Sequence, residues 1–246
     1  MTKHMGMIRT CLQTLRLGPV LACRPPLVHA FCMMIIRLHD VLPAAAAARL
    51  AESLSGRVRG GRPTSRVASE VDAEVEGEAG RRLADALRAH PLFCLGVQPS
   101  AVAPVTFACH EMGRCTDIHP PPGGERTALA RVDAFATVLL SDPADYDGGE
   151  LLIDSGYGDE TYREGAGVCV VLPASASHRV APVTRGTRWS GTLRVQSRVR
   201  DPAQREILYD MGCALHYLEL FGGGTQAEGD RLRRSYDGLL RLWAEP

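Results

Sequence analysis

Residues 178 to 197 read HRVAPVTRGTRWSGTLRVQS, two runs of strand-forming residues with a Pro and a Gly between them. Runs of similar character come earlier in the chain: PVTFACH, ARVDAFATVLLSD, GELLID and GVCVVLP. Short β-branched runs separated by turn residues are typical of an all-β sandwich or barrel. We therefore expect a β core that begins after Pro91 and ends near residue 197.

Helical segments are expected on both sides of this core. AAAAARLAESL, after Pro43, consists of strong helix formers, and EGEAGRRLADALRAH repeats apolar residues at helical spacing as far as Pro91. Beyond Asp201 the pattern is helical again, with a GGG break between PAQREILYDMGCALHYLELF and EGDRLRRSYDGLLRLW. ADYDGGEL fits a turn, because Asp-Gly and Gly-Gly tolerate positive φ. The fold class we expect is mainly β with flanking helices.

The chain divides into three parts. We assign residues 1–33 to an extension outside the fold, residues 34–198 to the main domain with its N-terminal helices, and residues 199–246 to a helical tail. The first 39 residues contain arginines but no Asp or Glu, as transit peptides do, and LGPVLAC faintly resembles a signal-peptide core. A translation start at Met33 or Met34 is a third explanation. The apolar run LGPVLAC is too short to span a membrane. We expect a cytoplasmic protein, with organelle targeting left open.

The overall composition disfavours several classes of function. The 28 basic and 28 acidic side chains give a formal net charge of zero, so nothing favours nucleic acid as a partner. The eight cysteines form no CxxC pair, and their low density suits reduced thiols better than a disulfide scaffold. Their spacing relative to the histidines fits no zinc pattern.

One group of residues near the end of the β core could carry chemistry. Arg188 follows His178 by ten residues, and Ser190 comes two residues later. Residues two apart in a strand point to the same face, so Arg188 and Ser190 project together. An arginine with a hydroxyl on the same side is a compact carboxylate receptor, and a histidine on a neighbouring strand could hold a metal beside that carboxylate.

This combination resembles the Fe(II)- and 2-oxoglutarate-dependent oxygenases. More narrowly, it resembles the bacterial PKHD-type hydroxylases, which are relatives of the prolyl 4-hydroxylase catalytic domain. The resemblance runs from about Met34 to the C-terminus, and two stretches carry it: LLSDPADYDGGELLI and VAPVTRGTRWSGTLRVQSRVRD. It implies a double-stranded β-helix, that is, a jelly roll.

The resemblance also implies roles for individual residues. His178 would be the distal Fe(II) ligand, Arg188 would hold the distal carboxylate of 2-oxoglutarate, and Ser190 would assist it. The reaction would be hydroxylation coupled to oxidative decarboxylation of 2-oxoglutarate, giving succinate and CO2, with ascorbate as an optional accessory. Two histidines and one carboxylate on a single face of the metal leave positions open for the co-substrate and oxygen.

The proximal half of the motif departs from the family. The family pattern reads roughly RYxxGxxYxxHxD, whereas CHEMGRCTDIHPP occupies that register here. Gly113 and His119 match, so His119 would be the proximal iron ligand. His110 stands where a tyrosine usually lines the co-substrate pocket, Thr116 replaces a second tyrosine, and Pro121 occupies the place of the metal-binding Asp.

Several donors could replace the missing acid. Asp117 is our best candidate, because in an extended strand it shares a face with His119, two residues on. Glu125 and His110 are further donors, and Asp133 is disfavoured because it matches a family position that is not normally a ligand. Halide-transferring relatives leave this coordination position open, but they carry a small residue there rather than a stiff PPP segment.

Two other classes of function compete with the oxygenase. A domain that lost its acid could bind 2-oxoglutarate or metal without catalysis, because metal affinity depends on ligand count and geometry. A metal-binding cupin is the weakest reading, since only His110, His119 and His178 lie in the core. The substrate is a small molecule or a peptide that the sequence does not identify. The C-terminal helices either pack on the core or form a homodimer.

Overall fold

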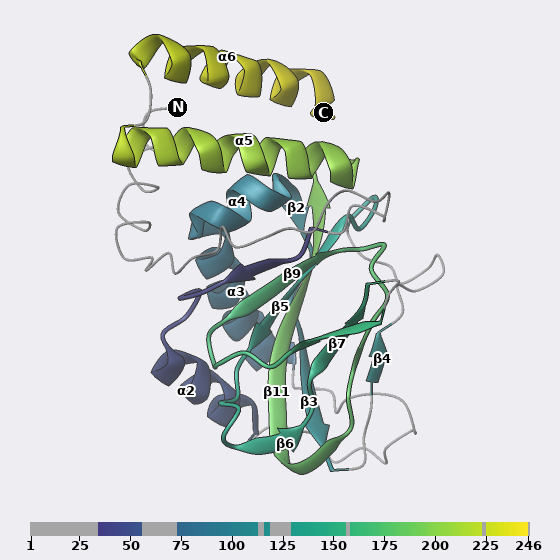
Figure 1. Cartoon of the computed structure of the whole chain (residues 1–246). Coiled ribbons are helices and arrows are strands. Elements are labelled where there is room, and N and C mark those ends of the chain that lie inside the picture. Colours follow the sequence, from purple (N-terminus) through teal and green to yellow (C-terminus); the bar gives the residue numbers. More distant parts are fainter. Residues whose placement is uncertain are drawn as a thin grey trace.

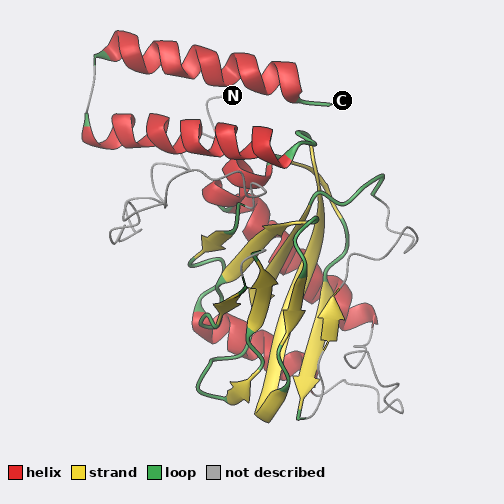
Figure 2. Ribbon diagram, turned by 45° about the vertical axis from the view of Figure 1, so that its right-hand side comes forward, coloured by secondary structure: helices red, strands yellow, loops and turns green. Residues whose placement is uncertain are grey.

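The computed structural model describes residues 34–55, 73–112, 116–118, 129–155, 158–222 and 225–245. Its centre is a pair of antiparallel β sheets, with helices on one face and at one end (Figures 1 and 2). The larger sheet has the order β1 (Ile36–Leu38), β9 (Cys169–Pro173), β5 (Ala134–Leu139), β11 (Val183–Ser197) and β2 (Pro99–Val102), and β3 (Thr106–Glu111) and β6 (Tyr146–Gly148) also pair with β11. The smaller sheet has the order β4 (Thr116–Ile118), β10 (His178–Val180), β7 (Leu151–Asp154) and β8 (Asp159–Tyr162).

The strand order confirms the predicted jelly roll. Apart from β7 and β8, neighbouring strands of the two sheets are far apart in sequence, and the strands of the described residues pair in antiparallel fashion. Such crossed connections take the chain repeatedly from one sheet to the other and so curl it around a shared interior. The two sheets meet through an apolar cluster that includes Phe135 from the larger sheet and Ile153 and Val180 from the smaller one.

Successive side chains of β11 alternate between the outer face of the larger sheet and its inner face. Trp189, Leu193 and Val195 belong to the cluster that the helices share with the outer face of the larger sheet. The residues between them therefore face the smaller sheet, because successive side chains of a strand point to opposite faces. Arg188 and Ser190 lie on this inner face, so the sequence-based expectation that they project together is confirmed.

Helices cover the outer face of the larger sheet. α2 (Ala44–Ser55) buries one stripe of small and apolar side chains, Ala47, Ala51 and Leu54, at helical spacing. α3 (Ala73–Ala89) packs against β3 and β11, with Leu83 and Leu87 fully buried. Both helices match segments that the sequence predicted.

A short helix, α4 (Pro91–Val97), stands where the sequence analysis expected the β core to begin. Pro91 is the first residue of this helix. A backbone N–H at this position would have no hydrogen-bond partner within the helix, so its absence in proline costs nothing. The helix ends at Gln98, whose φ of 49° is left-handed. A proline read as a helix stop was therefore also the first residue of the next helix.

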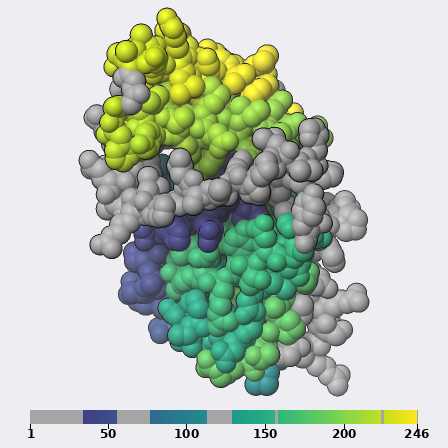
Figure 3. Space-filling view, in the orientation of Figure 1, coloured from purple at the N-terminus to yellow at the C-terminus, as the bar shows by residue number. Residues whose placement is uncertain are grey.

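Two long helices form a layer at one end of the molecule (Figures 1 and 3). α5 (Pro202–Phe221) begins after Asp201, whose side chain accepts from two backbone N–H groups, and it ends at Gly222 with φ +64°. α6 (Gln226–Trp243) begins with a capping box formed by Thr225 and Glu228, and it lies along α5. Homodimerisation through these helices stays a prediction.

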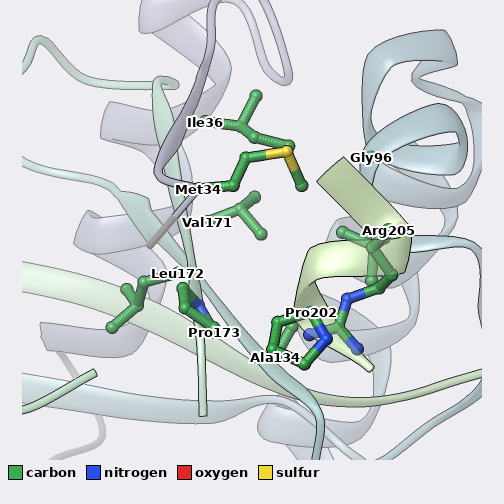
Figure 4. Close-up of a pocket in the computed structure, with 10 residues that line it drawn as sticks. Met34, Ile36, Gly96, Ala134, Val171, Leu172, Pro173, Pro202 and Arg205 are labelled. Atoms are coloured by element: carbon green, nitrogen blue, oxygen red, sulfur yellow. The ribbon is translucent and has the colours of Figure 1, made fainter. Parts of the chain in front are cut away.

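Arg205 ties α5 to the β core. Its guanidinium donates to the backbone carbonyls of Val199, Arg200 and Asp133 at 2.9, 2.8 and 3.2 Å. It lies beside a small, largely apolar pocket between α4, β1 and β9 (Figure 4). The three hydrogen bonds pair the buried guanidinium with backbone oxygens, so the role of Arg205 is structural. In the part of the chain that the structure describes, no helix combines the length and apolarity needed to cross a bilayer.

Replacing Gly191 by Ala should destabilise the fold. A Cβ there would lie 2.7 Å from Leu83 Cδ2 and 3.0 Å from Phe107 Cε1. Overpacking of this kind costs about 1–3 kcal/mol. Urea denaturation should show a loss of that size in the free energy of unfolding.

Gly238, in the middle of α6, is the matched control because nothing lies within 4 Å of a Cβ added there. Gly238→Ala should stabilise the protein by about 0.5–1 kcal/mol, since Ala replaces Gly in a helix interior. Equal shifts in both variants would contradict the packing of β11 against α3.

Candidate active site

Three of the predicted site residues meet on the inner face of the larger sheet. β3 and β11 are in register so that His110 lies opposite Arg188 and Ala108 lies opposite Ser190. Arg188 Nη1 lies 3.2 Å from Ser190 Oγ and 3.5 Å from His110 Nδ1. All three side chains are buried, and Arg188 is the largest of the fully buried ones.

The guanidinium of Arg188 retains unused donors. Burial lowers its pKa, while the nearby hydroxyl of Tyr146 and the carboxylate of Glu150 act in the opposite direction. Within the described residues, the buried Nε and Nη2 atoms have no hydrogen-bond partner. Buried donors without partners are costly, and an ionised one more so. The arrangement therefore suits a carboxylate that accepts two parallel bonds from the guanidinium.

The turn before β7 shapes the space around Arg188. Gly149 has φ +68°, and a Cβ at this position would lie 2.9 Å from Arg188 Cδ. The Tyr146 ring packs on the same glycine, with Arg163 on the ring at 5.1 Å. Arg163 also donates to the Tyr146 carbonyl at 2.6 Å and to the Glu150 carboxylate at 2.8 Å. The sequence analysis predicted the glycine turn but missed Tyr146, although both stand in DYDGGE.

His110 is held as a neutral ring. Burial, reinforced by the positive charge of Arg188, lowers its pKa to about 4. In the tautomer that accepts from Arg188 through Nδ1, the ring proton is on Nε2, because a guanidinium can only donate. Nε2 is buried and has no hydrogen-bond partner among the described residues. His110 can therefore offer one further donor beside the guanidinium.

His178 faces the same interior from the smaller sheet. Its ring is buried and lies 5.5 Å from the ring of Phe135, centroid to centroid. Nδ1 lies 3.0 Å from the carbonyl oxygen of Ala176, which can only accept, so Nδ1 carries the proton. The lone pair of the neutral ring is then on Nε2. A backbone carbonyl that fixes the tautomer in this way is typical of metal-binding histidines.

The remaining predicted ligands are only partly described. His119, Pro121 and Glu125 lie outside the described residues. β4 pairs with β10, which brings the segment before His119 alongside His178. The backbone register sets Ile118 opposite His178 and Asp117 opposite Arg179.

Asp133, which the sequence analysis disfavoured as a metal ligand, makes structural contacts. Its carboxylate accepts from Arg131 Nε at 2.9 and 3.0 Å and from the backbone N–H of Ser197 at 2.8 Å. Among the residues that the structure describes, no group of three His, Cys, Asp or Glu side chains could hold a metal ion. The identity of the third ligand stays a prediction.

Comparison with known proteins gives close relatives of one kind. No protein-family model matches the chain. A PKHD-type hydroxylase from Cupriavidus metallidurans is 35% identical over 233 residues, which cover 86% of this chain and 100% of the relative. A PKHD-type hydroxylase from Synechococcus sp. strain JA-2-3B'a(2-13) is 39% identical over 162 residues, 65% of this chain and 72% of the relative.

A solved structure agrees with the fold. A prolyl hydroxylase from Trichoplax adhaerens, in complex with a peptide fragment of hypoxia inducible factor, aligns with a TM-score of 0.50 at 12% identity. The alignment covers 70% of this chain and 86% of that protein. At this level of identity the likeness concerns the jelly roll alone.

The neutral His110 predicts a pH dependence of stability. The unfolded chain binds a proton at this ring below its ordinary pKa of 6.5, whereas the folded protein does so only near pH 4. Stability from this residue is therefore complete above pH 6.5 and is lost as the pH falls toward 4, by up to about 3 kcal/mol.

His110→Gln removes the titrating group, so the free energy of unfolding of the wild type relative to this variant should fall between pH 7 and pH 4. Urea denaturation at several pH values measures this difference. Parallel pH curves for the two proteins would show that His110 titrates as it does in water.

Proposed function

The chain belongs to the PKHD-type hydroxylases, and from that premise we propose that it is an Fe(II)- and 2-oxoglutarate-dependent dioxygenase. The proposed reaction hydroxylates a small molecule or peptide and converts 2-oxoglutarate to succinate and CO2. The observation that carries the proposal is the buried guanidinium of Arg188, with donors directed into the interior of the jelly roll.

The co-substrate pocket follows from the groups around that guanidinium. Arg188 would bind the distal carboxylate of 2-oxoglutarate, and Ser190 and the Nε2–H of His110 supply neighbouring hydroxyl and N–H donors. A neutral His110 suits this role, since a second buried cation would repel Arg188. Farther along the same face, the hydroxyls of Thr137 and Thr192 hydrogen-bond to each other at 3.1 Å, so one of their two hydroxyl protons is already used.

The metal would be held by His178 Nε2 and by His119. The fixed tautomer of His178 supports this role, as does the pairing of β4 with β10. Asp117 is our proposed third ligand; its backbone lies opposite Arg179 rather than His178, so it would reach the metal only if β4 shifted or twisted relative to β10. When bound, Fe(II) would supply the oxygen activation that couples decarboxylation to hydroxylation.

Other features of the proposed enzyme rest on its membership of the family alone. Ascorbate as an accessory, a cytoplasmic location and a homodimer through α5 and α6 remain proposals. A domain that binds 2-oxoglutarate without catalysis is the alternative, and Pro121 in the place of the usual acid is the feature that favours it. Binding and turnover must therefore be measured separately.

An anaerobic titration of the purified protein with Fe(II) and 2-oxoglutarate should produce their weak visible charge-transfer band. His178→Ala and Arg188→Ala should abolish the band, because they remove a metal ligand and the carboxylate anchor. Loss of the band in Asp117→Ala would identify the third ligand. Arg185→Ala removes an exposed arginine of the same strand and should leave the band unchanged.

Circular dichroism of each variant separates loss of the site from loss of the fold. No band in the folded wild-type protein with metal in excess would overturn the proposed oxygenase. A band without succinate production, in the presence of oxygen, would favour the binding-only alternative.

Gly149→Ala should weaken 2-oxoglutarate binding by roughly tenfold or more, because the added methyl group would displace Arg188 from its position. Gly158→Ala is the matched control. Gly158 also has a positive φ, +134°, but nothing lies within 4 Å of its Cβ position. Isothermal titration calorimetry with 2-oxoglutarate measures both variants. Equal affinities for the two would show that backbone strain, rather than contact with Arg188, is the cause.

A further inference from the structure

A carboxylate of the protein itself lies close to Arg188. Glu150 follows Gly149 directly in the chain, and a Cβ at Gly149 would lie 2.9 Å from Arg188 Cδ. The negative charge of Glu150 is near enough to raise the pKa of the guanidinium against the effect of burial. Glu150 is therefore a potential competitor for the donors that a carboxylate ligand would use.

Glu150 is paired with a different arginine. Its Oε1 accepts from Arg163 Nη1 at 2.8 Å, whereas the buried Nε and Nη2 of Arg188 have no hydrogen-bond partner among the described residues. The attraction between a carboxylate and a guanidinium is strongest where water is excluded, and Arg188 is the more deeply buried of the two arginines. The pairing with Arg163 is thus the one that leaves the stronger binding site unused.

Arg163 is held in place by the turn that precedes Glu150. Its Nη2 donates to the backbone carbonyls of Pro143 and Tyr146 at 2.8 and 2.6 Å, and its guanidinium lies 5.1 Å from the centroid of the Tyr146 ring. One nitrogen therefore binds the turn while the other binds the carboxylate. The planar fork fixes the angle between these two sets of bonds, so the place of the Glu150 carboxylate follows from that of the turn.

We infer that Arg163 is a positioning residue for the co-substrate: by pairing with Glu150 it keeps this carboxylate from occupying Arg188. The guanidinium of Arg188 then stays available to the distal carboxylate of 2-oxoglutarate, and the neutralised Glu150 repels the incoming anion less. This inference rests on the proposed function, because it takes Arg188 as the site of the co-substrate. Arg163 itself makes no contact with 2-oxoglutarate in this scheme.

The balance of charge predicts how substitutions should combine. Two arginines and one glutamate give the group one net positive charge, which matches a single ligand carboxylate. Without Arg163 the net charge is zero, and Glu150 is left to pair with Arg188. Without both Arg163 and Glu150 the single positive charge of Arg188 returns, and no carboxylate of the protein competes for it.

Anaerobic isothermal titration calorimetry of the full-length protein with Fe(II) measures the affinity for 2-oxoglutarate. Arg163→Gln should weaken this affinity by roughly tenfold or more, which is the value of a charge-assisted hydrogen bond. Glu150→Gln should leave the affinity within about threefold of the wild type. The double variant should recover most of the loss that Arg163→Gln causes, because the competing carboxylate is then absent.

A second ligand gives a readout that a purely structural role would not change. The probe is 2-oxopentanoate, which carries a methyl group in place of the distal carboxylate of 2-oxoglutarate. The wild type should prefer 2-oxoglutarate by roughly tenfold or more. Arg163→Gln should lose most of this preference, since only the distal carboxylate competes with Glu150, and the double variant should regain it.

Two further variants separate charge from geometry. Arg163→Lys keeps the positive charge beside Glu150 without the planar fork, so its loss of affinity should stay below about threefold. Arg185→Gln is the matched control, because it breaks an ion pair with Asp147 in the same turn whose two side chains are both exposed. It should bind 2-oxoglutarate as the wild type does.

Unchanged affinity in Arg163→Gln would overturn the inference. Equal losses in Arg163→Gln and in the double variant would also overturn it, since they would show that Arg163 only supports the turn. Circular dichroism identifies a variant that does not fold. If Arg163→Gln is unfolded, a loss of tenfold or more in folded Arg163→Lys would be decisive against the inference. Failure of 2-oxoglutarate to bind the wild type would instead overturn the proposed function, and the inference with it.

Discussion

Burying the guanidinium of Arg188 between two β sheets requires compensation from its surroundings, because an ionised group loses its hydration there. The protein compensates only in part. The Ser190 hydroxyl accepts a hydrogen bond from one guanidinium nitrogen, and His110 stays neutral beside it. The Tyr146 hydroxyl and the Glu150 carboxylate oppose the lowering of the Arg188 pKa by burial. A carboxylate ligand would complete the compensation. Much of the local structure, from the left-handed Gly149 to the position of Arg163 on Tyr146, can be understood as support for this one cation.

β11 organises the rest of the molecule because it serves both faces of the larger sheet. Its outer side chains join the core under α2 and α3, and its inner ones form the polar row that begins at Arg188. A shift of the strand by one residue would exchange these two sets. The pairing with β3 and β5, on opposite edges, fixes the register, so the same hydrogen bonds that stabilise the fold also set the site.

The proximal half of the proposed site departs from the family pattern of the sequence analysis more than the distal half does. The histidine in the tyrosine position, His110, takes a lowered pKa from its burial beside Arg188, and can donate from Nε2 as a tyrosine hydroxyl could. In the proposed co-substrate pocket, this substitution would preserve a hydrogen-bond donor. Pro121 cannot replace the usual acid in the same way, because proline supplies neither a hydrogen-bond donor nor a metal ligand.

The sequence alone determined the fold class, most of the helices, and the shared face of Arg188 and Ser190. α5 began and ended where its apolar periodicity, Asp201 and the glycines predicted, because these signals are local. Arg188 and Ser190 could be assigned to one face from a spacing of two. The short helix α4 was missed because Pro91 is compatible with both the end of one helix and the start of another.

Only the tertiary structure decided which distant residues meet. Tyr146, Gly149 and Phe135 are neighbours of Arg188 or His178 through strand pairing and turns, which leave no periodic trace in the sequence. A strand pattern specifies which residues share a face, but the face becomes a site only when a second sheet closes over it.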